Sequence, residues 1–373
     1  MSNKQTVYDA LIIGAGQTGL ATGFKLQQEG LNFLILEGRE QVEGSFGSYY
    51  DSLKLFTPVP FSQLPGMDMK YDKRHYPSRD EFIGYLQDYA KGHELPVQTA
   101  TKVEKVARHE LGFLLSTNQG EYLTRSVIDA SGPYNDPLIP QYPNQEAYKG
   151  QILHSYAYRN TKGFEGKRII IVGAGNSALQ IAMELKDVAN VTLGIRRKIK
   201  WVSQRILGLD IHWWMHTFGV DHFPLKEKPK GGIPVIDIGG YRKSIKRGEL
   251  DIRKIYERFT ETGVVWPDGT AEDIDIVLYA TGYEPKYQWL QGLDVFNDKG
   301  CLAHDNGVST KVPGLYFAGL FLQRNAASGN IRGAAYDAEY IARRVAHHLG
   351  KSSNSSGKDV WGVAFKQMRR KMV

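Results

Sequence analysis

The chain contains very little cysteine: Cys301 is the only one among 373 residues. A single cysteine excludes an internal disulfide, a Cys-x-x-Cys redox pair and a thiolate metal site. It therefore also excludes enzymes that work through a pair of their own cysteines. The motif His212-x-x-x-His216 lacks the glutamate beside its first histidine that a zinc protease needs, so we expect no bound metal.

Long apolar runs are missing as well. No window approaches about 18 consecutive apolar residues, so we expect no membrane-spanning segment. The first residues, MSNKQTVYDALIIG, lack the layout of a signal peptide, which predicts a cytoplasmic protein. A hydrophobic content of 42% and a charged content of 23% are typical of soluble globular proteins, and the length fits two domains of ordinary size.

The net charge of +7 is uneven along the chain. The stretch from Lys226 to Arg258 contains ten Lys and Arg but only five Asp and Glu. Such a surplus can steer an anionic cofactor toward its site, or it can be a solvated, lysine-rich face. The lack of a helical stripe favours the second interpretation. Nothing else in the sequence indicates a nucleic-acid partner.

Two glycine-rich motifs stand 159 residues apart, each after an apolar strand and at the start of an amphipathic helix. The strands are predicted at Asp9–Ile13 and Arg168–Val172. Glycines at these spacings allow a tight turn and close approach to a pyrophosphate, which the free N–H groups of the helix start can bind. The cofactor-binding residues predicted in these two turns are Gly14, Gly16, Gln17, Thr18 and Gly19, and Gly173, Gly175, Asn176, Ser177 and Ala178.

The two motifs differ at the residue that follows the next strand. Glu37 ends the predicted strand Asn32–Leu36, 18 residues after Gly19, and its carboxylate can accept from both hydroxyls of an adenosine ribose. The same offset in the second unit falls on Arg196, followed by Arg197, and guanidinium groups suit a 2′-phosphate. The first unit is therefore predicted to bind FAD or NAD, and the second to bind NADPH.

The domain organisation follows from a pair of similar segments. Strand and helix signals alternate along the chain, which is typical of an α/β fold with parallel sheets. Ile128–Pro133 and Leu278–Tyr283 each close a buried strand with a turn of small residues, and they bracket the second glycine motif. We interpret them as the points where the chain leaves the first domain and returns to it. The second domain is thus predicted to be an insertion in the first.

The later turns and the C-terminal part supply the remaining candidates. A long helix is predicted from about Gly333 to His348, and its N-terminus could face an isoalloxazine or belong to an ordinary strand–helix connection. After a linker at Lys351–Lys358, an apolar stripe from Val360 to Met368 predicts a helix that docks on the parent domain or on a second subunit, as in a homodimer. Further cofactor-binding candidates in turns are Gly132, Thr281, Gly282, Gly319 and Asn330.

The segment before the second motif carries a family resemblance. Its pattern Tyr148-x-Gly150-x-x-x-His154-x-x-x-Tyr158 resembles the identifying sequence of the flavin-containing monooxygenases, Phe-x-Gly-x-x-x-His-x-x-x-Phe/Tyr. Tyr148 in place of phenylalanine is a mild departure. Other segments that look like this family, closest to its short bacterial members, are Tyr50–Leu53 through Leu64–Gly66, Gly175–Ser177 and Ala280–Tyr283.

The resemblance implies both cofactors and an activity. It implies an α/β fold of two dinucleotide-binding, Rossmann-like domains, with an NADPH domain (160–282) inserted into an FAD domain (1–159 and 283–373). In the family, NADPH reduces the flavin, which forms a C4a-hydroperoxide with molecular oxygen. A small-molecule sulfide or amine, or alternatively a ketone, then takes up one oxygen atom. The resemblance implies that Asn176 and Ser177 hold NADPH, with Asn176 as the residue that can also face the flavin.

Two residues keep alternatives open. His154 is either a structural hydrogen-bonding group or a proton-transfer group, and its place on an inter-domain connection favours the first. Phe56 aligns with an asparagine that many family members carry close to the peroxide, and phenylalanine cannot hydrogen-bond to the peroxide.

Two other functions therefore remain as alternatives to the monooxygenase. One is an NADPH–flavin reductase or oxidase that releases hydrogen peroxide, and the other is a non-catalytic redox-sensing flavoprotein. The aromatic segment Trp201–Leu225 is a candidate substrate wall, but core packing or a subunit contact explains it equally well.

Overall fold

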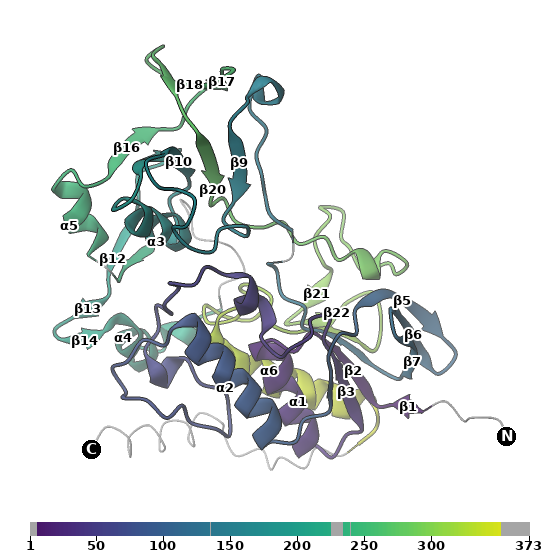
Figure 1. The fold of residues 1–373 in the computed structure, drawn as a ribbon. Coiled ribbons are helices and arrows are strands. Elements are labelled where there is room, and N and C mark those ends of the chain that lie inside the picture. The colour runs from purple at the N-terminus through teal and green to yellow at the C-terminus, as the bar shows by residue number, and fades with distance from the viewer. Residues whose placement is uncertain (1–5, 135, 225–233, 239, 352–373) are drawn as a thin grey trace.

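The computed structural model describes residues 6–134, 136–224, 234–238 and 240–351. The fold is mixed α/β, and Figure 1 shows two bodies, each built around its own sheet. The larger body contains residues from both ends of the described chain, and the smaller body contains the teal and green middle part. Among the described residues, no helix is both long and apolar enough to cross a membrane.

The larger body is centred on a seven-stranded sheet with the order β21-β22-β23-β8-β2-β3-β4. Its five strands from β23 to β4 are parallel, and β22 and β21 extend the edge in antiparallel fashion. The strands are β2 (Ala10–Ile13), β3 (Phe33–Leu36), β4 (Val97–Gln98), β8 (Val127–Asp129), β21 (His304–Asp305), β22 (Val308–Ser309) and β23 (Leu315–Phe317).

Both faces of this sheet are covered. Alternate residues of β2 point to opposite faces, so Ala10 and Ile12 pack against helices while Leu11 and Ile13 pack against a small second sheet. The helices are α1 (Gln17–Gln28), α2 (Arg79–Gly92) and α6 (Ile331–His348), and the small sheet consists of β1 (Val7–Tyr8), β7 (Gly120–Thr124), β6 (Gly112–Thr117) and β5 (Val103–His109). This coverage explains why the central strands are uninterrupted apolar runs.

The smaller body is centred on a five-stranded parallel sheet with the order β16-β11-β10-β20-β9. Helices pack on one face and a three-stranded antiparallel sheet packs on the other. The strands of the parallel sheet are β9 (Gln151–His154), β10 (Arg168–Val172), β11 (Asn190–Ile195), β16 (Asp251–Lys254) and β20 (Ile276–Tyr279). The covering elements are α3 (Asn176–Leu185), α5 (Tyr241–Lys246), β17 (Arg258–Phe259), β18 (Gly263–Val265) and β19 (Ala271–Asp273).

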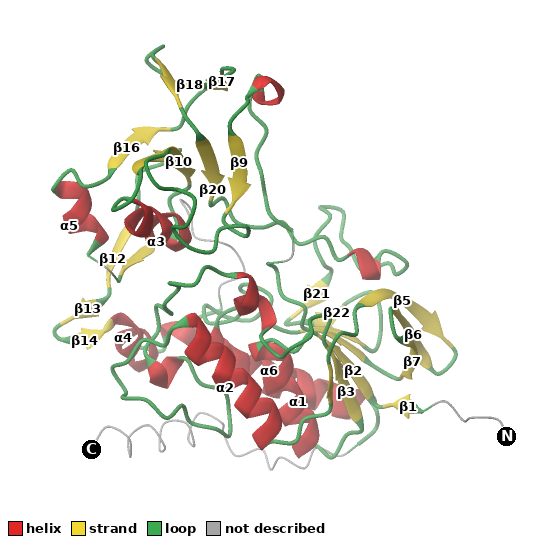
Figure 2. Cartoon of the chain, in the orientation of Figure 1, coloured by secondary structure: helices red, strands yellow, loops and turns green. Residues whose placement is uncertain are grey.

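Short elements connect the two bodies. In Figure 2, α4 (Ile211–Thr217) lies at the end of the smaller body that faces the larger one, and its rings contact Phe56 and Phe61 there. The other short elements are β12 (Trp201–Ser203), β13 (Arg205–Ile206), β14 (Leu209–Asp210), β15 (Val235–Asp237) and the 3-10 helices η1 (Gly44–Ser48), η2 (Val59–Phe61), η3 (Gln145–Ala147), η4 (Val220–His222) and η5 (Gln288–Leu290).

Most predicted elements are confirmed, with small shifts at their ends. The first two strands start one residue later than predicted, because the carboxylate of Asp9 accepts the N–H of Asn32 just before the ladder begins. The predicted long helix is confirmed, and it starts at Ile331. The apolar stripe Val360–Met368 lies outside the described residues, as does part of the basic stretch.

Candidate functional site

The first glycine loop joins the end of β2 to the start of α1. Gly14 has φ +99°, and a Cβ at this position would stand 2.9 Å from the carbonyl oxygen of Ala130, so only glycine fits comfortably. Gly19 packs differently: a Cβ there would overlap the carbonyl oxygen of Gly14, so this glycine allows the helix to pack closely on the loop. Both glycines therefore have the physical roles that the sequence predicts.

Neither glycine loop is followed by a capped helix. Gly16 is the N-cap residue of α1 and Gly175 is that of α3, and neither helix start receives a side-chain hydrogen bond at this position. By contrast, Ser78 and Glu81 form a capping box at the start of α2. An uncapped helix start presents free N–H groups and the positive end of the helix dipole. Both glycine loops are therefore suited to bind phosphate.

A cavity of about 520 Å³ opens above the first loop, at the carboxyl ends of the parallel strands. Its volume falls in the range of small-molecule sites, roughly 300–1,000 Å³. The cavity brings together residues far apart in sequence, because the turns after β2, β3, β8 and β23 meet at this edge. The predicted residues that line it are Gly14, Gly16, Gln17, Thr18, Glu37, Gly132 and Gly319.

Glu37 is almost completely buried at the wall of this cavity, with 7% of its surface exposed. One carboxylate oxygen accepts the N–H of Ala15 at 2.7 Å, and the other accepts the N–H of Arg39 at 2.9 Å. The carboxylate thus holds the glycine loop in position. A carboxylate has about four acceptor sites, so it retains capacity for the hydroxyls of a ribose.

Asn330 borders the cavity without lining it. It is the N-cap residue of α6, and its neighbour Gly329 lines the cavity wall. No side-chain hydrogen bond caps this helix start either. The positive end of the α6 dipole therefore borders the same cavity as the first glycine loop.

Sequence reasoning missed a pair at the wall of the cavity, a half-buried tryptophan and a buried aspartate. Trp289, a lining residue, donates its indole N–H to the carboxylate of Asp129 at 3.1 Å, and the N–H of Ser131 donates to the other oxygen at 3.0 Å. Burial raises the pKa of Asp129. The only available signal was an acidic residue at the end of an apolar strand, and its partner lies 160 residues away.

The second glycine loop repeats the first in the smaller body. Gly173 has φ +150°, and a Cβ there would stand 2.5 Å from the carbonyl oxygen of Ala280, just before Thr281 and Gly282. The side-chain oxygen of Asn176 accepts the N–H of Ile236 at 3.3 Å, while Ser177 is exposed. The predicted residues Gly173, Gly175, Asn176, Ser177, Ala178, Thr281 and Gly282 are thus gathered at one edge of the five-stranded sheet.

The hydrogen bonds correct one equivalence drawn from sequence spacing. Gly14 donates to the carbonyl of Leu36, and Gly173 donates to that of Gly194, so the counterpart of Glu37 is Ile195 and not Arg196. The hydrogen-bonded carbonyl comes one residue sooner after its glycine in the second unit, although β11 itself continues to Ile195. Arg196 comes immediately after Ile195, and both Arg196 and Arg197 are exposed. The second loop therefore has no carboxylate at this position and has two exposed cations beside it.

His154 is the last residue of β9 and contacts the connection that follows β20. Its Nδ1 accepts the N–H of Tyr156 at 3.1 Å, which leaves the proton on Nε2, and Nε2 donates to the carbonyl of Gly282 at 2.9 Å. Burial lowers the pKa of His154. A second proton on Nδ1 would face the N–H of Tyr156, so the geometry favours the structural role over proton transfer.

Phe56 does not line the cavity but lies against α4. Its ring stacks on that of His212, with centroids 6.1 Å apart. His212 is buried and its Nδ1 lies 2.7 Å from the carboxylate of Asp210, whose other oxygen accepts the hydroxyl of Tyr76 at 2.6 Å. The hydrogen bonds from His212 and Tyr76 hold the pKa of Asp210 below its usual value despite burial. Part of the segment Trp201–Leu225 thus packs on the larger body around Phe56.

The comparisons with known proteins agree with this geometry. A model of the pyridine nucleotide-disulphide oxidoreductase family matches residues 11–209. A CzcO-like oxidoreductase from Geobacillus kaustophilus is 34% identical over 92% of this chain and 100% of its own length. The probable indole-3-pyruvate monooxygenase YUCCA1 from Arabidopsis thaliana is 30% identical over 79% of this chain and 80% of its own.

The structural comparison points in the same direction. The flavin-containing monooxygenase from Stenotrophomonas maltophilia superposes with a TM-score of 0.82 at 28% identity, and the match covers 92% of this chain and 100% of that one. The family that the Tyr148–Tyr158 motif predicts is therefore confirmed. The chain belongs to the bacterial flavin-containing monooxygenase-like oxidoreductases, within the wider pyridine nucleotide-disulphide oxidoreductase family.

Proposed function

We propose that this protein is an NADPH- and FAD-dependent monooxygenase that inserts one oxygen atom into a soft nucleophile, a sulfide or an amine. The observation that carries the proposal is the contrast between the two glycine loops. One has the buried Glu37 at the end of its second strand, and the other has Ile195 followed by two exposed arginines. Such a pair of loops distinguishes a ribose with free hydroxyls from a ribose with a 2′-phosphate.

The first loop is the proposed FAD site. The free N–H groups after Gly16 bind the pyrophosphate, and Glu37 accepts from the adenosine ribose. The flavin end extends toward Gly132, Gly319 and Asn330, where the N-terminus of α6 favours negative charge on the reduced ring. The larger body, formed by 1–159 and 283–373, is the proposed FAD domain.

The second loop is the proposed NADPH site, in a domain formed by 160–282. The uncapped start of α3 binds the pyrophosphate, with Asn176 and Ser177 as its first residues. Arg196 and Arg197 bind the 2′-phosphate with charge-assisted hydrogen bonds. Thr281 and Gly282, on the connection back to the larger body, lie beside the nicotinamide end.

A bound flavin supplies the redox chemistry, since it accepts a hydride from NADPH and, once reduced, activates molecular oxygen for transfer. The protein has to hold the two cofactors together and keep water away from the reacting atoms. The packing of Phe56, Phe61, His212 and Trp213 forms an apolar aromatic wall between the two bodies. This wall is the proposed boundary of the substrate space.

A second candidate is an NADPH oxidase that releases hydrogen peroxide. It is favoured by Phe56, whose ring has no hydrogen-bond donor, at the position where many family members carry an asparagine. A ketone substrate is a further variant, because the Arabidopsis relative is named for indole-3-pyruvate, a 2-oxo acid.

The decisive experiment measures how much NADPH is oxidised, how much oxygenated product forms and how much hydrogen peroxide is released. The purified protein is expected to carry FAD and to oxidise NADPH faster when an alkyl sulfide or amine is added, with less than one peroxide per NADPH. Equal rates with and without any sulfide, amine or 2-oxo acid, and one peroxide per NADPH, would establish the oxidase instead. A flavin that NADPH does not reduce would contradict both and would leave the redox sensor.

A further inference from the structure

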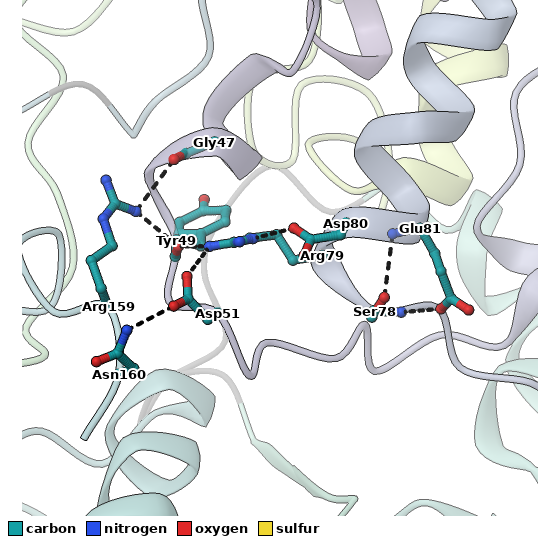
Figure 3. A network of polar contacts seen from close by, with 9 residues as sticks. All are labelled: Gly47, Tyr49, Asp51, Ser78, Arg79, Asp80, Glu81, Arg159 and Asn160. Carbon is teal, nitrogen blue, oxygen red and sulfur yellow. Dashed lines mark hydrogen bonds and ion pairs between the residues drawn. The ribbon is translucent and has the colours of Figure 1, made fainter. Parts of the chain in front are cut away.

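Four consecutive residues of the larger body, Tyr49–Ser52, hold the smaller body in place; we call them the latch strip. The strip follows η1 and passes close to the start of α2 (Figure 3). Every residue of it hydrogen-bonds to the smaller body or to the chain that leads into it. The contacts fall into two groups, one on α3 and one on Arg159–Asn160.

The contacts on α3 lie on one face of that helix. The hydroxyl of Tyr50 donates to Gln180 at 2.6 Å, and the hydroxyl of Ser52 donates to Glu184 at 2.5 Å. Gln180 and Glu184 are four residues apart, so they are neighbours on the helix surface. The same helix begins at Asn176, directly after the second glycine loop. A fixed contact on this face therefore fixes the position of the loop.

Tyr50 is more than a surface contact. Only 3% of its surface is exposed, and its ring lies in the hydrophobic core of the smaller body, 6.1 Å from the ring of Tyr158. Leu53, next to the strip, packs against the cores of both bodies. A side chain from the larger body is thus built into the core of the smaller one.

Asp51 joins the start of α2 to the chain that leads into the smaller body. One carboxylate oxygen accepts from Arg79 at the start of α2 at 2.7 Å, and the other accepts from the amide of Asn160 at 2.8 Å. These two hydrogen bonds hold the pKa of Asp51 below its ordinary value. Arg79 and Arg159 both donate to the carbonyl of Tyr49 at 2.8 Å, and Figure 3 shows them approaching it from opposite sides.

We infer that the latch strip sets the position of the NADPH loop relative to the flavin site, and that Asp51 is a positioning residue for hydride transfer. The inference rests on the proposed function, since it needs both cofactors. Reacting atoms must approach to about 3–3.5 Å, and a displacement of 1 Å can slow a reaction by about 100-fold. Loosening the strip therefore slows flavin reduction without removing any group that touches a cofactor.

The test uses two variants and a matched control. Asp51→Ala removes the bridge from the larger body, and Asn160→Ala removes its partner on the way into the smaller body; both side chains are at the surface. Asp80→Ala is the control, because Asp80 pairs with the same Arg79 but lies within α2. The measurements are FAD content, the rate of anaerobic flavin reduction at saturating NADPH, the NADPH dissociation constant and amide hydrogen exchange.

We expect Asp51→Ala and Asn160→Ala to reduce the flavin roughly 10- to 100-fold more slowly, with normal FAD content and an NADPH dissociation constant within about threefold of wild type. The N–H of Asp51, which donates to the carbonyl of Arg159 at 2.8 Å, should exchange faster even without cofactors. Asp80→Ala should match wild type. Reduction and exchange rates equal to those of Asp80→Ala would overturn the inference. A wild-type flavin that NADPH fails to reduce would overturn the proposed function, and the exchange of the cofactor-free variants would then decide whether the strip holds the two bodies together.

Discussion

Replacing Glu37 by glutamine tests the first cofactor site most directly. The substitution keeps the shape of the side chain but replaces one acceptor oxygen by an NH₂ donor. In the structure both oxygens accept backbone N–H groups, those of Ala15 and Arg39, at 2.7 and 2.9 Å. Glutamine can serve only one of them, so one N–H in a buried site loses its acceptor. Such a loss costs about 1–3 kcal/mol.

The same change weakens FAD binding for a separate reason. The glycine loop is less well held, and the ribose hydroxyls lose an ionised acceptor. We expect Glu37→Gln to lower the free energy of unfolding of the cofactor-free protein by about 1–3 kcal/mol and to raise the FAD dissociation constant by one to two decades, at roughly 1.4 kcal/mol per decade. Urea denaturation measures the first quantity, and quenching of flavin fluorescence measures the second.

Glu40→Gln, three residues away and exposed, is the matched control and should change neither quantity. If the free energy of unfolding falls as expected but the FAD dissociation constant stays at the wild-type value, Glu37 only supports the loop. The assignment of FAD to this site would then lose its main argument. Wild-type values for both quantities would refute the hydrogen-bond reasoning itself.

Three further outcomes are expected. Arg196→Gln should raise the Michaelis constant for NADPH by one to two decades, the equivalent of about 1.5–3 kcal/mol, and leave that for NADH unchanged, with a larger loss when Arg197 is also replaced; unchanged selectivity in both would place it elsewhere. Phe56→Asn should lower the share of NADPH that ends as peroxide when a sulfide is present, and an equal share would remove Phe56 from the reaction. Burial raises the pKa of Asp337 from 3.8 to about 7, so the folded form keeps a proton that the unfolded form has lost, and wild-type stability falls as pH rises from about 4 to 7 and levels off above 7. Asp337→Asn should therefore gain in unfolding free energy relative to wild type as pH rises from about 4.5 to 7 and hold a constant difference above about pH 8, whereas a constant difference over the whole range would contradict the shift.

Local signals in the sequence were sufficient for the elements that shape each loop. An apolar strand, a glycine turn and an amphipathic helix are contiguous in the chain, so their pattern predicts both their existence and their order. The two strands that close with Ala130 and Ala280 were predicted for the same reason, and both alanine carbonyls face a glycine loop. Counting residues failed at the residue that follows the paired strand position. The hydrogen-bonded pair Gly173–Gly194 is one residue closer in sequence than the pair Gly14–Leu36, so the counterpart of Glu37 is Ile195.

Contacts between distant segments carried no such signal. Trp289 with Asp129 and Asp210 with Tyr76 join residues more than 100 positions apart, and each partner alone is an ordinary residue of its segment. The latch strip was visible only as a family-like stretch, because hydrogen bonds to Gln180 and Asn160 depend on how the two bodies pack. Burial and long-range pairing are properties of the packed chain, and they cannot be predicted from the local patterns of one sequence.

The disulphide chemistry in the wider family's name does not extend to this chain's own side chains. A flavin reduced by NADPH can pass electrons to a protein disulfide only where two cysteines lie within reach of the ring. Cys301 is the single cysteine, it is exposed, and the lining of the cavity at the first glycine loop does not include it.

The two glycine loops, with their bound cofactors, would transfer electrons in the same way in a disulfide reductase and in a monooxygenase. What the electrons then reach depends on the surroundings of the flavin, and the cavity at the first glycine loop is lined by glycine turns and bordered by the uncapped start of α6. Electrons delivered to such a site have oxygen or a small molecule as their acceptor, which is the physical reason why the monooxygenase and oxidase proposals, and not a dithiol mechanism, are the ones to separate by experiment.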